Sequence, residues 1–388
     1  MIKYWLWLAT RKNFTPRERC RVARHFVSPE AAYFASAEEY REISGLRNIS
    51  ALLDKDLTQA ETILEQCREM NIRIITMQDA AYPGRLLSLD DAPVVLYCRG
   101  KLADFNVPMV AVVGTRNASA YGLTHAKRMS FGLAKCGCVV VSGGAKGVDT
   151  QASRGALLGN GMTIVVLACG LDVNYPSENK QLFREVSDRG CLISEYPPGT
   201  QANKFRFPER NRIISGLALG VLVAEAPERS GALITAHHAL EQGRDVFVLP
   251  ANVGVTATKG NLKLLREGAI PVGTAWDIVQ EYAPQYPRIL RKSMEEPEEE
   301  QHTNDIPAKK VIDKPKAKDY IDLKEMQGPL TEEEQRMVQM LSGGIMHIED
   351  VVEQTRLPAS QALQVLTRLQ IKGVVCRPSA GMYELAEK

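Results

Sequence analysis

The chain has 388 residues, of which 45% are hydrophobic and 24% charged, and its formal net charge is +2. This length predicts two or three domains with room for a large core, and the near-neutral charge excludes a global cationic field, so any nucleic-acid site must be a local patch. The eight cysteines are scattered and no histidine completes a metal site, which indicates buried thiols in a reducing cytosol. No apolar run reaches ~18 residues and no export signal is evident, so we expect a cytoplasmic protein without a membrane span.

Residues 1–75 are predicted to form a helical module of the SAM or helix-hairpin-helix kind, in which prolines and glycines separate short amphipathic segments. The run 40–50 (YREISGLRNIS) has the form of a helix-hairpin-helix turn, whose backbone NH groups would bind a phosphate. A small helical bundle with a glycine cap at Gly45 explains the same run, and it is the interpretation that we favour.

Between residues 76 and 288, short apolar runs alternate with helical stretches, which is typical of a Rossmann-like, doubly wound and mostly parallel α/β sheet. Many of the runs are rich in Val and Ile and do not alternate with polar residues, as expected of strands buried on both faces. The expected strands are 94–97, 109–113, 138–142, 163–167, 191–194, 219–224, 245–249 and 270–272, and the expected helices include 118–135, 150–160, 177–189 and 232–242.

Two consecutive β-α units between residues 110 and 149 each end their strand in a glycine-rich turn. The turns are Gly114-Thr115-Arg116 and Ser142-Gly143-Gly144-Ala145-Lys146-Gly147. Parallel sheets bind ligands at the carboxyl ends of their strands, where loop NH groups and helix N-termini favour anions, and here each turn adds a cation. These turns therefore predict a site for phosphate groups. Neither a G-x-G-x-x-G nor a Walker A sequence is present, which disfavours a bound NAD and a P-loop.

A third segment, residues 204–212 (KFRFPERNR), carries four cations, one acid and two aromatic residues, and we expect it in a loop that leads into a helix. Cations that follow a phosphate backbone, with rings on which bases stack at ~1–3 kcal/mol each, suit a single-stranded nucleic acid. The alternative is a solvated basic loop with a phenylalanine packed on the core. Because Arg116 and Lys146 are expected at neighbouring strand ends, we predict that the three segments converge in one cationic groove.

Two carboxylates also follow expected strand ends, Glu195 and Glu225, and Ser230 with Thr235 opens a helix whose N-terminus would accept an anion. The two carboxylates could serve as a general acid and base. We favour the alternative that they hold the arginines in place, because no nucleophile, metal cluster or activated histidine accompanies them.

Residues 289–328 combine a glutamate run with a segment rich in Lys and Pro, and they predict a flexible charged linker. Residues 329–388 are typical of a winged-helix domain, with helices expected at 331–341, 347–354 and 358–372 before a β-hairpin. This region carries six Lys or Arg against eight Asp or Glu, and its third helix offers only Arg368 and Lys372 as cations. A protein-contact or regulatory role is therefore favoured over strong DNA binding.

The chain resembles the DprA/Smf family of bacterial DNA-processing proteins in a series of motifs that follow the family order over about 200 residues. The matching segments are 82–83, 91–100, 112–116, 141–149, 207–217 and 230–236. The chain departs from the family pattern at Pro250-Ala251, where a glycine usually follows the proline, and at Lys259-Gly260-Asn261. The contribution of the latter loop is left open.

The resemblance implies a protein that binds and shields single-stranded DNA during natural transformation, forms a homodimer and loads the RecA recombinase, with no catalytic turnover and no cofactor. Together with the basic segment, it gives a set of candidate DNA-binding residues from all three segments. They are Gly114, Thr115, Arg116, Ser142, Gly143, Lys146, Gly147, Lys204, Arg206, Phe207, Arg210, Asn211 and Arg212.

The rival interpretation is a nucleotide-binding enzyme of the phosphoribohydrolase, lysine decarboxylase-like type. That class needs a Pro-Gly-Gly-x-Gly-Thr-x-x-Glu signature, and the nearest segment, 225–231, lacks the glycines. A structural adaptor is a third possibility, which the basic segment disfavours.

Overall fold

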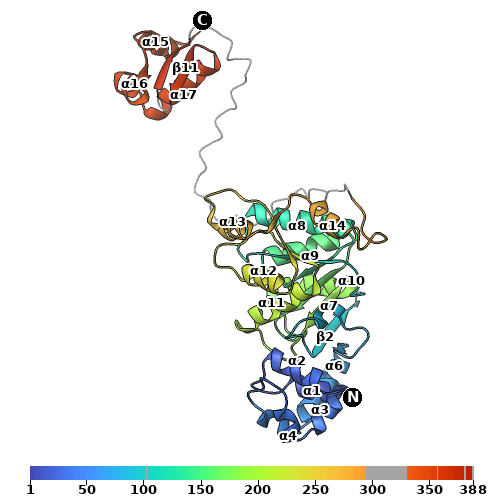
Figure 1. Ribbon diagram of the computed structural model, residues 1–388. Coiled ribbons are helices and arrows are strands. Elements are labelled where there is room, and N and C mark those ends of the chain that lie inside the picture. Colours follow the sequence, from blue (N-terminus) through green and yellow to red (C-terminus); the bar gives the residue numbers. More distant parts are fainter. Residues whose placement is uncertain (102–103, 294–329, 356, 380–381, 387–388) are drawn as a thin grey trace. The chain divides into compact units, whose positions relative to one another are not determined.

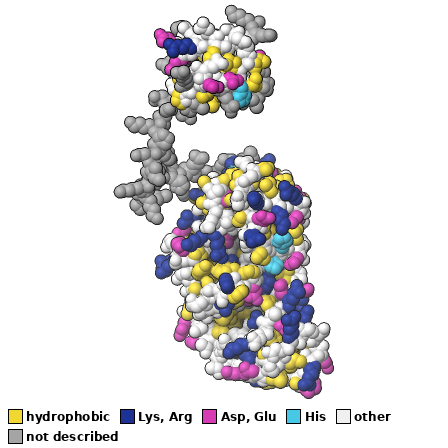
Figure 2. Space-filling model, turned by 90° about the vertical axis from the view of Figure 1, so that its left-hand side faces the viewer, with side chains coloured by type: hydrophobic (Ala, Val, Ile, Leu, Met, Phe, Trp, Pro, Cys, Tyr) yellow, Lys and Arg dark blue, Asp and Glu magenta, His cyan; other side chains and the backbone are white. Residues whose placement is uncertain are grey.

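The computed structural model describes residues 1–101, 104–293, 330–355, 357–379 and 382–386. Two compact units lie within residues 1–300 and 301–388 (Figure 1, Figure 2). No helix among the described residues is both long and apolar enough to cross a bilayer.

Six helices open the first unit. They are α1 (Ile2–Ala9), α2 (Pro16–His25), α3 (Pro29–Phe34), α4 (Ala37–Arg41), α5 (Ser50–Leu53) and α6 (Thr58–Glu69). Helix α2 starts at Pro16, because Thr15 and Glu18 form a capping box and the proline suits the first helical position. Trp7, Tyr40 and Leu52 are fully buried between these helices.

The turn between α4 and α5 is held from within the molecule. The Arg21 guanidinium donates to the carbonyls of Ser44 at 3.4 Å and Gly45 at 3.3 Å, and the Glu18 carboxylate accepts the backbone NH of Arg47 at 3.0 Å. One NH that a phosphate would need in a helix-hairpin-helix is thus already bonded, which favours the helical bundle.

A nine-stranded sheet forms the body of the first unit, in the order β1-β2-β6-β5-β4-β3-β7-β8-β9. The strands are β1 (Arg73–Thr76), β2 (Val95–Gly100), β3 (Met109–Val113), β4 (Val139–Ser142), β5 (Thr163–Leu167), β6 (Cys191–Ser194), β7 (Gly220–Val223), β8 (Asp245–Val248) and β9 (Ile270–Pro271). All pairs from β6 to β9 are parallel, whereas β2 is antiparallel to both β1 and β6. The predicted Rossmann-like, mostly parallel sheet is confirmed; β1 was not among the expected strands.

Helices cover both faces of this sheet. They are α7 (Gly84–Leu87), α8 (Ala120–Lys135), α9 (Val148–Leu158), α10 (Lys180–Arg189), α11 (Arg206–Leu217), α12 (Gly231–Glu241), α13 (Lys259–Arg266) and α14 (Ala275–Tyr282), with 3-10 turns η1 (Ser177–Asn179) and η2 (Thr256–Thr258). On β3, Ala111 and Val113 pack against α11 and α12, whereas Val110 and Val112 pack against α8, α9 and α14. Burial on both faces explains why these strands read as continuous runs of Val and Ile.

Strand β3 lies between β4 and β7. The strands β4, β5 and β6 extend the sheet on one side of β3, and β7, β8 and β9 extend it on the other. The carboxyl ends of β3, β4 and β7 therefore border the switch point where doubly wound sheets bind ligands. The expectation that residues 204–212 form a loop is wrong in one respect, because α11 already begins at Arg206. Side chains from 206 onward consequently follow a helical period and leave the segment in different directions.

The second unit consists of α15 (Glu332–Leu341), β10 (Met346–His347), α16 (Ile348–Thr355), α17 (Ala359–Ile371), β11 (Val375–Ser379) and β12 (Met382–Leu385). Its antiparallel sheet has the order β10-β12-β11, and the predicted winged helix is confirmed. Lys372, counted as a cation available to DNA, donates to the buried Glu334 at 2.7 Å. The predicted linker lies largely outside the described residues, and the boundaries at 75, 288 and 328 remain proposals.

Candidate nucleic-acid interface

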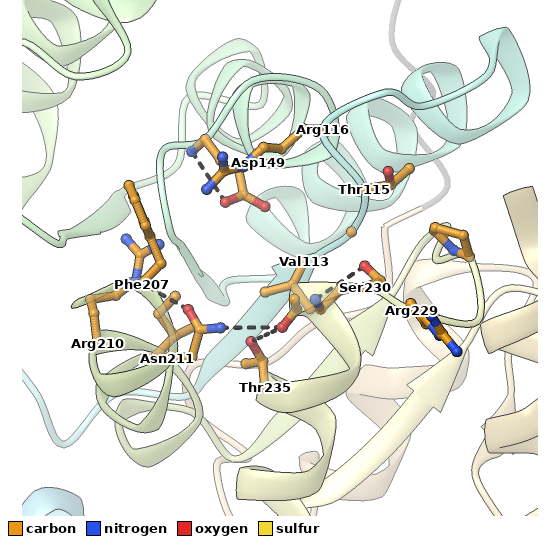
Figure 3. A pocket seen from close by; sticks show the side chains of 16 residues that line it. Val113, Thr115, Arg116, Asp149, Phe207, Arg210, Asn211, Arg229, Ser230 and Thr235 are labelled. Carbon is orange, nitrogen blue, oxygen red and sulfur yellow. Dashed lines mark hydrogen bonds between the residues drawn. The ribbon is translucent and has the colours of Figure 1, made fainter. Parts of the chain in front are cut away.

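A cavity of about 260 Å³ lies at the carboxyl ends of β3, β4 and β7 (Figure 3). Its walls come from the turns after β3 and β4, from α11, and from the segment that leads into α12. The lining residues are Val113, Gly114, Thr115, Arg116, Ala145, Asp149, Phe207, Arg210, Asn211, Ile214, Pro227, Arg229, Ser230, Gly231, Ala232 and Thr235. We call it the switch-point cavity. The structure thus brings the three predicted segments together at one site.

The two glycine-rich turns touch each other at Gly147. This residue has φ +80°, and a Cβ on it would lie 2.5 Å from the carbonyl oxygen of Thr115 and 2.6 Å from that of Arg116. Only glycine fits this close approach in this conformation. The NH of Val148 donates to the same Thr115 carbonyl at 3.3 Å, and the NH of Thr115 donates to the carbonyl of Glu225 at 2.7 Å. The turns after β3, β4 and β7 are therefore locked to one another.

Ser142 and Gly143 support the cavity without lining it. The Ser142 hydroxyl is fully buried and donates to the carbonyl of Val112 at 2.8 Å, so it joins β4 to β3. A Cβ on Gly143 would lie 2.7 Å from a guanidinium nitrogen of Arg210 and 2.8 Å from the carboxylate of Asp149. This glycine therefore makes room for the arginine and the carboxylate behind the turn.

Arg210 and Asp149 are two buried ionisable residues that lie close together in the cavity wall. The Arg210 guanidinium, 4% exposed, donates to the carbonyls of Gly143 at 2.6 Å and of Val166. The Asp149 carboxylate accepts the NH of Ala145 at 3.2 Å. Burial raises the pKa of Asp149 to about 6, although Arg210 opposes this rise, and burial lowers the pKa of Arg210 to about 10. Arg210 thus fixes the turn after β4 while its charge stays at the wall.

Arg116 and Phe207 face each other at the cavity. The Arg116 guanidinium carbon lies 4.8 Å from the centroid of the Phe207 ring, within the range of a cation–π contact. The ring of Tyr175 lies 5.5 Å from Phe207, centroid to centroid, at an interplanar angle of 44°. The three side chains therefore form a cluster of one cation and two tilted rings, in which Arg116 and Tyr175 are exposed and Phe207 is half-buried.

Sequence reasoning missed two residues of this site, Tyr175 and Arg229. Tyr175 lies in the segment after β5. The sequence feature that could have identified it is an aromatic residue before a proline, beyond the end of a strand. Arg229 is exposed, lines the cavity, and precedes Ser230, whose hydroxyl caps α12 by accepting the NH of Ala232 at 3.2 Å. Figure 3 shows Phe207, Arg210 and Asn211 on one side of the cavity and Ser230 and Arg229 on the other.

Four predicted cations lie outside the cavity lining: Lys146, Lys204, Arg206 and Arg212. Lys146 is about half exposed and forms an ion pair with Glu178, which lowers the pKa of that carboxyl through their hydrogen bond. The Lys204 ammonium lies 5.1 Å from the ring centroid of Phe205, a side chain that is 74% exposed. Arg206 donates to the carbonyl of Gln201 at 2.6 Å and stacks on Tyr196. Lys146, Lys204 and Arg206 surround the α11 N-terminus and the turn after β4.

Arg212 lies in a different environment from the cavity. It is 3% exposed and donates twice to Glu195, at 2.7 and 2.8 Å, while Asp91 lies 3.6 Å from its Nε. Burial raises the pKa of Glu195, against the effect of Arg212. Glu195 therefore holds an arginine as we expected. That expectation is wrong for Glu225, whose carboxylate accepts the NH of Ser119 at 3.0 Å and its hydroxyl.

Asn261 belongs to the 259–261 segment, whose contribution the sequence left open, and it fixes the loop after β7. It is fully buried, accepts the NH of Ala226 at 2.7 Å, and donates to the carbonyls of Ala224 and Leu249 at 3.1 Å each. The segment 259–261 thus supports the cavity wall from behind.

A family model described as DNA recombination-mediator protein A matches residues 73–283, and a model of the DprA winged helix domain matches residues 324–381. The chain belongs to the DNA recombination-mediator protein A family. It is 38% identical over 275 residues to Protein Smf of Synechocystis sp., covering 69% of each chain, and 41% identical to the DNA processing protein DprA of Streptococcus pneumoniae, covering 62% of this chain and 85% of the relative. The predicted resemblance is confirmed.

Two solved structures of the family are similar to this chain. The X-ray structure of DprA from Streptococcus pneumoniae has a TM-score of 0.65 at 35% identity, and the match covers 72% of this chain and 98% of that one. DNA processing protein A from Helicobacter pylori, described by its single-stranded DNA binding mode, has a TM-score of 0.50 at 31% identity, and the match covers 55% and 97%.

Proposed function

We propose that this member of the family binds single-stranded DNA in the switch-point cavity. The observation that carries the proposal is the cluster of Arg116, Phe207 and Tyr175 beside the exposed cation Arg229. Rings for bases and cations for phosphates, side by side, are what a single strand requires. The relative from Helicobacter pylori, which is described by its single-stranded DNA binding mode, adds support.

Phosphate contacts carry the binding in this proposal. Arg116 and Arg229 are exposed cations on two different walls, and α12 directs its N-terminus to the same cavity. Phosphate contacts position a strand and carry no sequence information, and stacking on a phenylalanine accepts every base. We therefore expect binding that is independent of sequence and weakened strongly by salt.

The decisive experiment is a salt titration of oligonucleotide binding with Arg116→Ala. Each lost phosphate contact on a single strand removes about 0.7 from the slope of log affinity against log salt. The matched control is Arg154→Ala, which removes an exposed arginine from α9, away from the cavity lining. An Arg116→Ala protein with the wild-type slope and affinity would refute the proposed site.

We further infer that the bound strand is passed to the RecA recombinase and that the protein acts as a homodimer. The family description as a recombination mediator supports the first inference, and the resemblance in sequence implies both. Strand exchange by RecA, with and without this protein, tests the hand-over, and light scattering of the purified chain tests the dimer. RecA activity that stays the same at every protein concentration, or a monomeric mass, would contradict the respective inference.

Binding in this proposal involves no turnover and no cofactor. The enzyme interpretation is not favoured, because Glu195 and Glu225 are both outside the lining of the switch-point cavity and have different partners. Incubation with AMP, followed by detection of free adenine, tests this directly. Adenine release that disappears in Asp149→Asn would reverse our conclusion.

A further inference from the structure

Positive charge is concentrated on helix α2 and the residues before it. None of these residues lines the switch-point cavity. Residues 11–25 contain six Lys or Arg and one acid, Glu18. Arg17, Arg21 and Arg24 are spaced i, i+4, i+7, so they lie on one face of α2, and all three are exposed. Arg47, on the adjoining turn between α4 and α5, is exposed as well. We call these four residues the α2 patch.

The positive charge of the α2 patch exceeds that of the one carboxylate on α2, Glu18, which interacts with Arg47. Glu18 is buried, and its carboxylate is occupied by the NH and hydroxyl of Thr15 and by the backbone NH of Arg47. None of the four arginines forms an ion pair in the part of the chain that the structure describes.

Neutral backbone oxygens orient two of these side chains. Arg21 donates to the carbonyls of Ser44 and Gly45, and Arg24 donates to those of Leu87 at 2.6 Å and Leu89 at 2.8 Å. Carbonyl contacts hold a guanidinium in place without cancelling its charge. Arg21 and Arg24 are therefore two fixed positive charges within the α2 patch.

A second cavity, of about 360 Å³, lies between α2 and the start of α11. Its lining includes Arg19 from α2, Glu195 and Tyr196 after β6, and Arg206 and Glu209 from α11. Since β6 runs parallel to β5, β4 and β3, this cavity opens at the same sheet edge as the first. Helix α11 lines both cavities, and Arg19 enters the second from the face of α2 opposite the α2 patch. In Figure 1, α2 lies between the other N-terminal helices and the sheet.

We propose that the α2 patch is a second contact for the DNA backbone, reached by the strand after it crosses the N-terminus of α11. This inference rests on the proposed function and extends it, since it gives the helical N-terminal region a role in holding nucleic acid. Lys204 and Arg206 lie at the crossing point. Along α2 the three arginines are separated by rises of about 6 Å and about 4.5 Å, a row that suits a polymer with one charge per nucleotide.

The test compares two double variants on oligonucleotides of two lengths. Arg17→Ala with Arg47→Ala removes two exposed charges of the α2 patch whose side chains donate no hydrogen bond among the described contacts. The control, Arg41→Ala with Arg68→Ala, removes two exposed arginines of the same helical region that are paired with Glu38 and Glu65. One oligonucleotide of about five nucleotides covers only the switch-point cavity, and another of about 25 reaches both sites.

We expect the patch variant to bind the long oligonucleotide about three- to tenfold more weakly at low salt, with a salt slope lower by about 1.4, because two contacts of about 0.7 each are lost. Binding of the short oligonucleotide stays at the wild-type level, and the control variant matches wild type on both. Arg17→Lys with Arg47→Lys keeps the charge and is expected to restore most of the affinity, which separates a loss of charge from a loss of folding.

Two results would overturn the inference. One is a patch variant that matches the control on the long oligonucleotide. The other is an equal loss on both oligonucleotides, which would place the effect at the switch-point cavity or in the fold. The proposed function is judged separately, by Arg116→Ala on the short oligonucleotide, because that binding does not involve the α2 patch.

Discussion

The two cavities on either side of α11 contain similar residue types and differ in how their charges are matched. In the switch-point cavity, Arg116 and Arg229 are exposed and the only carboxylate in the lining, Asp149, is buried. In the second cavity, Arg19 and Arg206 are accompanied by Glu195 and Glu209. The first cavity therefore offers unmatched positive charge to an anion, whereas the second is close to neutral. A count of cations in sequence does not distinguish the two.

The helical period of α11 explains how its first residues line both cavities. Phe207, Arg210, Asn211 and Ile214 recur at i, i+3, i+4 and i+7 and line the switch-point cavity, whereas Arg206 and Glu209 line the other. Residues two apart on a helix point to different sides, which separates Arg210 from Arg212. Arg210 is held by backbone carbonyls and Arg212 by carboxylates. Variants can test whether these two arginines have separate roles.

The largest effect is expected for Arg212→Ala. This change leaves Glu195 buried without its partner, which costs about 3–5 kcal/mol in the free energy of unfolding. DNA affinity of the folded protein is expected to stay unchanged, because Arg212 does not line the switch-point cavity. Urea unfolding followed by circular dichroism gives the first quantity and an oligonucleotide titration the second. Arg212→Ala with Glu195→Gln should recover part of the stability, and a folded variant with lost DNA affinity would break the comparison.

The next effect concerns pH and Asp149. Because its pKa is raised from 3.8 to about 6, the folded state binds a proton more tightly than the unfolded state, so stability falls as pH rises from about 4 to about 6. That rise in pKa corresponds to about 3 kcal/mol. We expect the unfolding free energy of wild type, measured relative to that of Asp149→Asn, to fall by about 3 kcal/mol between about pH 4 and about pH 6.

DNA binding should shift in the same direction. A phosphate in the cavity disfavours the Asp149 carboxylate, so binding takes up a proton and wild-type affinity rises as pH falls from about 8 to about 6. Asp149→Asn is expected to lose this dependence. A wild-type affinity that is constant over this range would show that the strand does not approach Asp149.

Phe207→Ala is expected to have a smaller effect, confined to binding. Loss of one base stack costs about 1–3 kcal/mol of binding free energy. Phe34→Ala is the matched control, because this ring is 69% exposed and lies on α3, outside the cavity lining. Fluorescence anisotropy with a labelled oligonucleotide measures both. Equal losses in the two variants would contradict the assignment of the cavity as the stacking site.

The smallest effect is expected at Lys146, whose charge is shared with Glu178 in an exposed pair. Glu178→Gln frees the lysine and should tighten DNA binding slightly, whereas Lys146→Ala should lower the salt slope by at most about 0.7. Parallel salt titrations of the two variants provide the measurement. Changes of the same sign would show that this pair acts through the fold and not through its charge.

Much of the fold was predictable because burial on both faces leaves a local trace in sequence, the uninterrupted Val and Ile runs of β3 to β8. Arg116 was predictable for a similar reason, since a cation at the end of a buried strand has a known place in a parallel sheet. The destinations of Arg206 and Arg212 were not. They depend on where α11 begins, and Phe205 provides no side-chain cap to mark that position.

Partners from distant segments also left no local signal. The pairing of Lys146 with Glu178 and the approach of Tyr175 to Phe207 depend on how the segment after β5 packs beside the turn after β4 and the start of α11. Arg229 is one exposed cation in a loop, and only the position of α12 places it at the cavity.

Gly147 presses the turn after β4 against the carbonyls of the turn after β3, so Thr115 and Arg116 cannot move apart from it. The proposed binding site is consequently ordered before any ligand binds. The conformational entropy of these turns is lost during folding and not during association. On binding as proposed, only the flexible single strand loses conformational entropy. For the proposed binding of single-stranded DNA, such a preorganised site favours rapid capture of successive stretches of one strand.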